Sequence, residues 1–142
     1  MSTIIDWRPN AGFGGDLERR LQRGMTRAVL FVEAEVIRSI SIGQAVKRSK
    51  GGRLRGLNPS RPGEPPHVLY GRLKQSIKHV VEMTAAGIVG RVGTNVVYAR
   101  RLELGYVGTD KKGRNVNQAP RPFLRPAILN NRSRIFDLIT RG

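Results

Sequence analysis

The first third of the chain carries an amphipathic helical pattern. Apolar residues recur at spacings of three or four positions from Leu17 to Ile40, and charged residues fill the opposite side. A glycine-rich joint precedes this stretch, Asp16 is a plausible N-cap, and Gly43 is a plausible stop. The pattern predicts a helix of about 25 residues that follows an extended N-terminal arm over residues 1–15.

Shorter elements are predicted in the second half. They are a short helix, a β-hairpin around a small-residue turn, a second short helix that ends at a glycine, and a last helix that begins near a proline. Their ranges are, in order, 69–77, 78–83 with 88–92, 96–104, and 126 onward. We therefore expect an α+β fold in a single domain, residues 1–142. Its long N-terminal helix and C-terminal helix would pack on a small antiparallel β-sheet.

Two long stretches show no periodicity and are basic, which predicts loops at residues 44–67 and 106–120. Each could be a solvated loop, or a loop that becomes ordered against a neighbouring subunit or DNA. Their cations are the candidates for contact with DNA, and they are Lys47, Arg48, Lys50, Arg53, Arg55, Lys111, Lys112 and Arg114.

Net charge narrows the choice of partner. The 142 residues include 26 Lys and Arg against 10 Asp and Glu, which gives a net charge of +16. Such an excess favours a polyanionic partner, nucleic acid first and an anionic membrane surface second. The longest apolar run, Ala28 to Val32, is too short to span a membrane, and the N-terminus lacks the features of a secretion signal. We expect the protein to remain in the cytoplasm in which it is translated.

The sequence shows no arrangement of residues that predicts catalysis. There is no cysteine, and the two histidines, His67 and His79, lie apart from any cluster of metal ligands. Ser39, Ser41 and Ser76 have no recognisable base near them in the sequence. We therefore expect no enzyme activity, no metal and no cofactor.

Glu103 is the acid of greatest interest because Arg100, Arg101 and Arg121 surround it in a basic part of the sequence. It could form a salt bridge within the subunit that orients Arg121. It could instead form an ion pair between subunits that sets their register. A catalytic carboxylate is the least supported alternative, since no second acid has a suitable spacing. These four residues are the candidates for a subunit interface.

Five short motifs occur in a fixed order between residues 60 and 127. They are Pro-Gly-Glu-Pro-Pro at 62–66, Gly-Arg-Leu-Lys-Gln-Ser-Ile at 71–77, Val-Gly-Thr at 92–94, Tyr-Ala-Arg-Arg-Leu-Glu-Leu-Gly at 98–105 and Arg-Pro-Phe-Leu-Arg-Pro-Ala at 121–127. This ordered set resembles the neck or tail-completion (head–tail joining) proteins of long-tailed bacteriophages. Two departures are Tyr70, where a small hydroxyl residue is common, and a long segment from Tyr106 to Ala119.

The resemblance implies a structural protein of the virion, assembled in the host cytoplasm into a ring that is expected to be hexameric. Its expected partners are head–tail connector or stopper proteins, tail terminator or tail tube proteins, and double-stranded DNA that passes without sequence-specific contacts. The alternative is a free basic nucleic-acid-binding protein that acts as a monomer or small oligomer. It predicts steeply salt-dependent DNA binding by the monomer.

Overall fold

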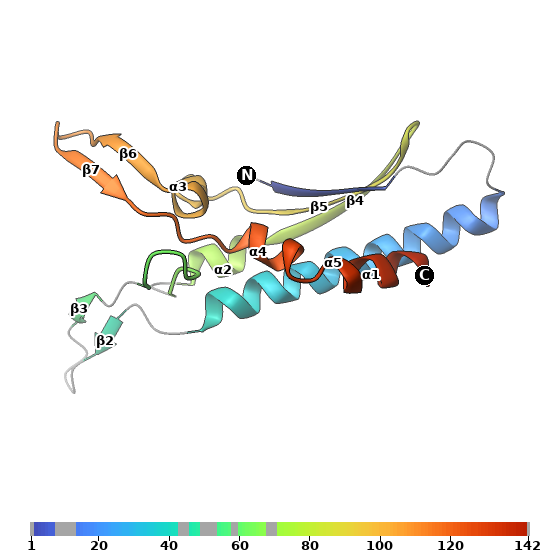
Figure 1. Cartoon of the computed structure of the whole chain (residues 1–142), viewed down its shortest axis with the longest axis horizontal. Helices are drawn as coiled ribbons and strands as arrows, with labels where there is room; N and C mark the ends of the chain where they lie inside the picture. Colours follow the sequence, from blue (N-terminus) through green and yellow to red (C-terminus); the bar gives the residue numbers. More distant parts are fainter. Residues whose placement is uncertain are drawn as a thin grey trace.

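The computed structural model describes residues 2–7, 14–42, 46–48, 54–57, 60–67 and 71–141. Its elements, in chain order, are β1 (Ser2–Trp7), α1 (Gly15–Ser41), β2 (Val46–Arg48), β3 (Leu54–Leu57), α2 (Arg72–Ser76), β4 (Lys78–Thr84), β5 (Gly87–Gly93), α3 (Ala99–Leu104), β6 (Tyr106–Thr109), β7 (Asn115–Gln118), α4 (Leu124–Leu129) and α5 (Arg132–Thr140). The α+β fold is confirmed (Figure 1). The predicted stop at Gly43 lies outside the described residues.

The long helix is present and has 27 residues. Its N-cap is Gly14 and not Asp16, which lies in the first turn and pairs with Arg19 at 2.6 Å. A carboxylate in the first turn is favourable because it faces the positive end of the helix dipole. The apolar side of α1 is fully buried at Met25, Val32 and Val36 and forms the centre of the core.

Helix α1 covers one face of a three-stranded antiparallel sheet with the strand order β1-β5-β4. Ile88 and Val92 on β5 point into the core. Gly90 lies between them, where a Cβ atom would come within 2.5 Å of the Val29 side chain. The predicted hairpin β4–β5 is therefore confirmed, and it gains β1 as a third strand. Part of the region predicted to be an extended arm thus belongs to the sheet.

The opposite face of the sheet is open (Figure 1). Ile4, Arg91 and Val80 stand opposite one another on the three strands, and Ile4 is 55% and Val80 49% exposed. Arg91 forms an ion pair with Glu82 on the same strand pair. In the described part of the chain, the helices pack on only one side of this sheet.

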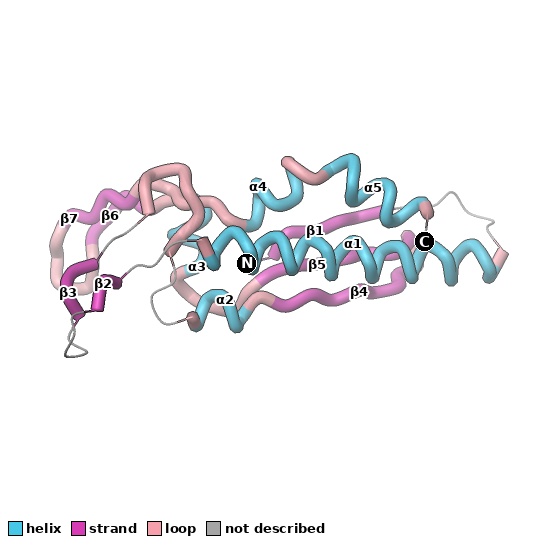
Figure 2. The backbone as a smooth tube through the Cα atoms, turned by 90° about the horizontal axis from the view of Figure 1, so that it is seen from below, coloured by secondary structure: helices cyan, strands magenta, loops and turns pink. Residues whose placement is uncertain are grey.

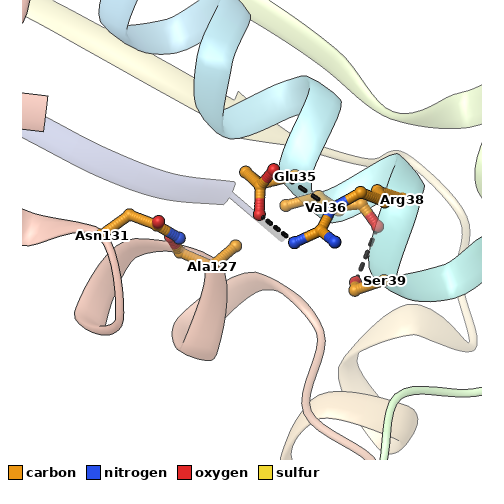
Figure 3. Close-up of polar contacts among 6 residues, drawn as sticks. All are labelled: Glu35, Val36, Arg38, Ser39, Ala127 and Asn131. Carbon is orange, nitrogen blue, oxygen red and sulfur yellow. Dashed lines mark hydrogen bonds and ion pairs between the residues drawn. The ribbon is translucent and has the colours of Figure 1, made fainter. Parts of the chain in front are cut away.

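The single predicted C-terminal helix is two helices, α4 and α5, separated at Asn130 and Asn131. The Asn131 side chain donates a hydrogen bond to the carbonyl of Ala127 at 2.9 Å and so ends α4 (Figure 3). This break turns α5 against α1, to which it runs antiparallel (Figures 1 and 2). Ile135 and Ile139 are the buried residues of α5.

The prediction of a loop at residues 106–120 is wrong. Strands β6 and β7 form an antiparallel hairpin in which Tyr106 faces Gln118 and Thr109 faces Asn115. The other predicted loop, at residues 44–67, also contains a strand pair, β2 with β3. The two strands of the β6–β7 hairpin are only four residues long, Tyr-Val-Gly-Thr and Asn-Val-Asn-Gln, too short to show the sustained alternation of apolar and polar residues that predicts strands.

Gly24 allows α1 and α5 to pack closely, since a Cβ atom there would lie 2.3 Å from the carbonyl oxygen of Ile139. In an open helix, Gly→Ala stabilises by up to about 1 kcal/mol. We predict the reverse for Gly24→Ala, a loss of about 1–3 kcal/mol in the free energy of unfolding, because α5 must move away. Chemical denaturation measures it. Gly15→Ala, with open space around it, is the control. Stabilisation by both substitutions would contradict the close packing.

Candidate assembly interface

The Glu103 carboxylate is buried and binds the start of α4. Glu103 lies on α3 and is 4% exposed. One of its oxygens accepts hydrogen bonds from the backbone N–H groups of Phe123 at 2.8 Å and Leu124 at 3.0 Å. The other accepts from the N–H of Arg125 at 2.8 Å. These N–H groups have no acceptor within the helix, so the carboxylate caps α4 from a distant position in the sequence.

Arg121 does not pair with Glu103 among the described residues. Its backbone N–H donates to the carbonyl of Leu102 at 2.6 Å, and its Nε donates to the carbonyl of Ser60 at 3.1 Å. The N–H of Gly63 donates to the carbonyl of Pro120 at 2.9 Å. Three of the sequence motifs therefore meet at one junction, and Arg121 holds it together from within the subunit.

This geometry corrects the interpretation of Glu103. The alternative of a salt bridge to Arg121 within the subunit is not observed among the described residues, and the ion pair between subunits stays a prediction. Here both oxygens accept backbone hydrogen bonds in a buried site. Glu103 has a structural role in the α3–α4 junction. The sequence could not reveal this role, because the donors are backbone N–H groups, which nearly every residue type has.

Arg100 and Arg101 remain exposed on α3. The Arg101 guanidinium lies 4.1 Å from the centre of the Tyr106 ring, a cation–π contact that connects α3 to β6. Two apolar residues at the ends of this segment are also exposed, Val97 before α3 at 94% and Leu104 at its last position at 58%. Such exposure of apolar groups beside cations is typical of a surface that another protein covers.

The β6–β7 hairpin extends away from the core, at the end of the molecule opposite to the β4–β5 turn (Figure 1). One of its faces is exposed along its length and includes Val107, which is 81% exposed. Strands β2 and β3 lie at the same end of the molecule (Figures 1 and 2), apart from the hairpin in Figure 1. The side chains of Lys47, Arg48 and Arg55, and residues Lys50 and Arg53, lie outside what the structure describes.

Asp110 organises the tip of this hairpin. Its carboxylate accepts hydrogen bonds from the N–H groups of Lys112 at 2.8 Å and Arg114 at 2.9 Å, and pairs with the Arg114 guanidinium at 2.7 Å. Lys111 and Lys112 are exposed at the turn. Of the three DNA-contact candidates in this segment, Arg114 thus forms an ion pair with Asp110, whereas Lys111 and Lys112 are exposed.

Two further polar features were missed by the sequence. A hollow of about 760 Å³ lies on the open sheet face and is lined by Lys78, Val80, Glu82, Arg91 and residues of the α2 and 93–95 segments. At one side of it the hydroxyls of Ser76 and Thr94 are 2.5 Å apart. His79 pairs with Glu33 of α1 and so joins the sheet to the helix. Neither histidine belongs to a metal site among the described residues, which hold no group of three or more potential ligands.

Within the described chain, no helix is long and apolar enough to cross a membrane. No protein-family model, curated protein or solved structure matches this chain.

We predict that Glu103→Gln lowers the free energy of unfolding by about 2 kcal/mol or more, because hydrogen bonds to a charged acceptor each contribute about 1.5–3 kcal/mol and an amide offers one oxygen in place of two. Urea titration measures the change. Glu18→Gln, on the exposed first turn of α1, is the control and should shift stability by less than about 1 kcal/mol. Equal effects of the two substitutions would exclude the capping role.

The hairpin tip should also respond to acid. Hydrogen bonds from the backbone and side chain of Arg114 lower the pKa of Asp110. A pKa lower in the folded than in the unfolded state stabilises the turn fully above the usual Asp value of about 3.9. That stabilisation is lost as the pH falls through the lowered pKa. We expect the amide NMR signals of Lys112 and Arg114 to shift with a midpoint below the usual value. A midpoint at or above it would contradict this geometry.

Proposed function

We propose that this protein is a structural component of a bacteriophage virion that forms a ring in the neck, between the head connector and the tail. The ordered motifs at residues 62–127 support the proposal. In the structure, the last two of them build the α3–α4 junction around Glu103, and residues 60–63 are bound to it. The motifs at this junction therefore stabilise the fold. Motifs shared within a family of structural proteins would be expected to have this role.

The observation that carries the proposal is the projecting β6–β7 hairpin. An isolated two-stranded hairpin is at best marginally stable in water, and a third strand or a packing partner is usually needed. This hairpin leaves a whole face exposed, with Val107 on it, and Val97 and Leu104 are exposed near its base. We infer that a neighbouring subunit or a neck partner covers these groups.

The same proposal assigns the partners and the location. The ring, expected to be a hexamer, would contact head–tail connector or stopper proteins on one side and tail terminator or tail tube proteins on the other. Double-stranded DNA would pass through its lumen, with Lys111 and Lys112 among the candidate contacts. The assembly would form in the host cytoplasm and remain in the virion neck.

The net charge of +16 favours one alternative, a free nucleic-acid-binding protein that acts as a monomer or small oligomer. The two proposals differ in what the isolated chain does. The alternative requires tight binding of DNA by the monomer at about 0.15 M salt, where nonspecific contacts are weakened. Negligible binding there, combined with ring formation, would exclude it.

Electron microscopy of the purified protein, alone and mixed with connector and tail proteins, tests the neck proposal. We expect ring-shaped particles. Val97→Asp and Val107→Asp should abolish the rings while leaving the melting temperature within about 2 °C, because both side chains are already exposed in the subunit. Leu30→Asp, an exposed apolar residue on α1, is the matched control and should leave the rings intact. Particles that are only monomeric, in virions and in mixtures alike, would overturn the proposal.

A further inference from the structure

The outer face of the helix layer carries a second concentration of positive charge, away from both predicted basic loops. Helices α1 and α5 lie side by side, and Figure 2 shows this layer from the side opposite to the sheet. The apolar side of α1 is buried against the sheet and α5. What remains on the solvent side of both helices is dominated by arginine.

On α1, Arg20, Arg23 and Arg27 are exposed at spacings of three and four residues. They therefore share one side of the helix, with rises of about 4.5 and 6 Å between them. None of the three has an ion pair in the described part of the chain, where the acids of α1 are matched to other residues: Asp16 to Arg19, Glu33 to His79 and Glu35 to Arg38. Glu18 lies on a different side of the helix at 100° per residue.

Helix α5 continues the same surface. Its buried residues Ile135 and Ile139 point toward α1. At about 100° per residue, Arg134 on α5 and Arg141, its C-cap residue, lie between about 100° and 160° from these isoleucines around the helix, so both project away from the core, and both are exposed. They are seven residues apart, or about 10.5 Å. Asp137 is the acid nearest to them on α5 and is partly buried. We call Arg20, Arg23, Arg27, Arg134 and Arg141 the arginine face.

The chemistry of this face favours phosphate. All five cations are guanidinium groups, which bind phosphate oxygens through paired N–H donors and do not lose their charge. Like charges one turn apart on a helix destabilise it when nothing neutralises them. Packed helices lie about 8–10 Å apart, so the face presents two rows of cations. Each row is about 10.5 Å long, enough to follow about three phosphates of a DNA strand at 3.4 Å of axis each.

An anionic membrane fits this face less well. Helices that bind membrane surfaces insert a broad apolar side between the lipids. The apolar side of α1 is instead buried against the sheet, and Leu30 is the large apolar residue exposed beside the arginines. Guanidinium groups without an apolar side are suited to a ligand whose charge lies on its surface, as in the DNA duplex.

We propose that the arginine face binds the phosphate backbone of double-stranded DNA without sequence preference. This assigns DNA contact to a surface on the helices, whereas the sequence directed attention to the loops. The assignment does not require a ring, so it goes beyond the proposed neck function and can be tested separately. Passage of DNA along such a face would involve contacts to phosphates alone, which permit sliding.

Fluorescence anisotropy with a labelled 20-base-pair duplex, measured between 50 and 200 mM NaCl, tests the proposal with two matched variants. Arg23→Gln with Arg27→Gln removes two charges from the arginine face, and Lys111→Gln with Lys112→Gln removes two from the hairpin tip. Glutamine retains helix propensity, and none of these side chains has a partner among the described interactions, so both variants should fold. Circular dichroism checks that they do.

We expect the plot of log K against log salt to lose a slope of about 1.8 in the helix variant, and its affinity at 0.1 M salt to fall at least about tenfold. The hairpin variant should lose less slope than the helix variant. Arg38→Gln is a further control, since Arg38 already forms a bidentate pair with Glu35 (Figure 3), and should change the slope little. An unchanged slope in the helix variant, or wild-type binding to phosphatidylserine vesicles but not to DNA, would overturn the proposal.

Images of the same samples separate this proposal from the neck proposal. Rings that form while the helix variant binds DNA normally would exclude only the arginine face. Monomers whose DNA binding depends on Arg23 and Arg27 would support the arginine face and count against the neck ring.

Discussion

The buried carboxylate of Glu103 is the interaction on which one end of this molecule depends. It connects α3, which begins the projecting hairpin, to α4, which begins the C-terminal helices. Phe123 and Leu124, whose N–H groups it binds, are both fully buried in the core. A cap that is formed through a distant side chain thus fixes the position of the hairpin relative to the α1–sheet core.

The packing of α5 on α1 is the second constraint, and it follows from the first. Because α4 starts at a fixed point, the break at Asn130 and Asn131 can return the chain along α1, where Gly24 lets the two helices approach. This close approach creates the arginine face by placing two rows of cations side by side. The core, the hairpin and the basic surface are therefore connected by a small number of polar contacts.

The sequence predicted the elements that have a strong hydrophobic period. The α1 helix and the β4–β5 hairpin were predicted because Leu17–Ile40 and the Val- and Ile-rich strands repeat at helical and strand spacings. The β6–β7 hairpin was missed because its pairing depends on backbone hydrogen bonds and on the Asp110 turn, in strands of only four residues each. The third strand β1 was missed because its partner lies far away in the sequence.

Prediction of the candidate site was limited in the same way. Arg121 and Glu103 were singled out, but their partners are backbone atoms, which the residue types cannot reveal. Arg23 and Arg27 belong to the predicted polar side of the first helix, but the surface that they share with α5 forms only because the chain breaks between α4 and α5. Long-range packing therefore determines which of the many cations of this chain act together.

Hydrogen exchange at single amides tests the central claim most directly, namely that Glu103 fixes the α3–α4 junction. In the free protein, the amides of Phe123, Leu124 and Arg125 should exchange about as slowly as those of the α1 core, because their release requires loss of a buried carboxylate contact. The amides of the β6–β7 tip should exchange much faster. Exchange of the three capped amides as fast as that of the hairpin tip would contradict the account.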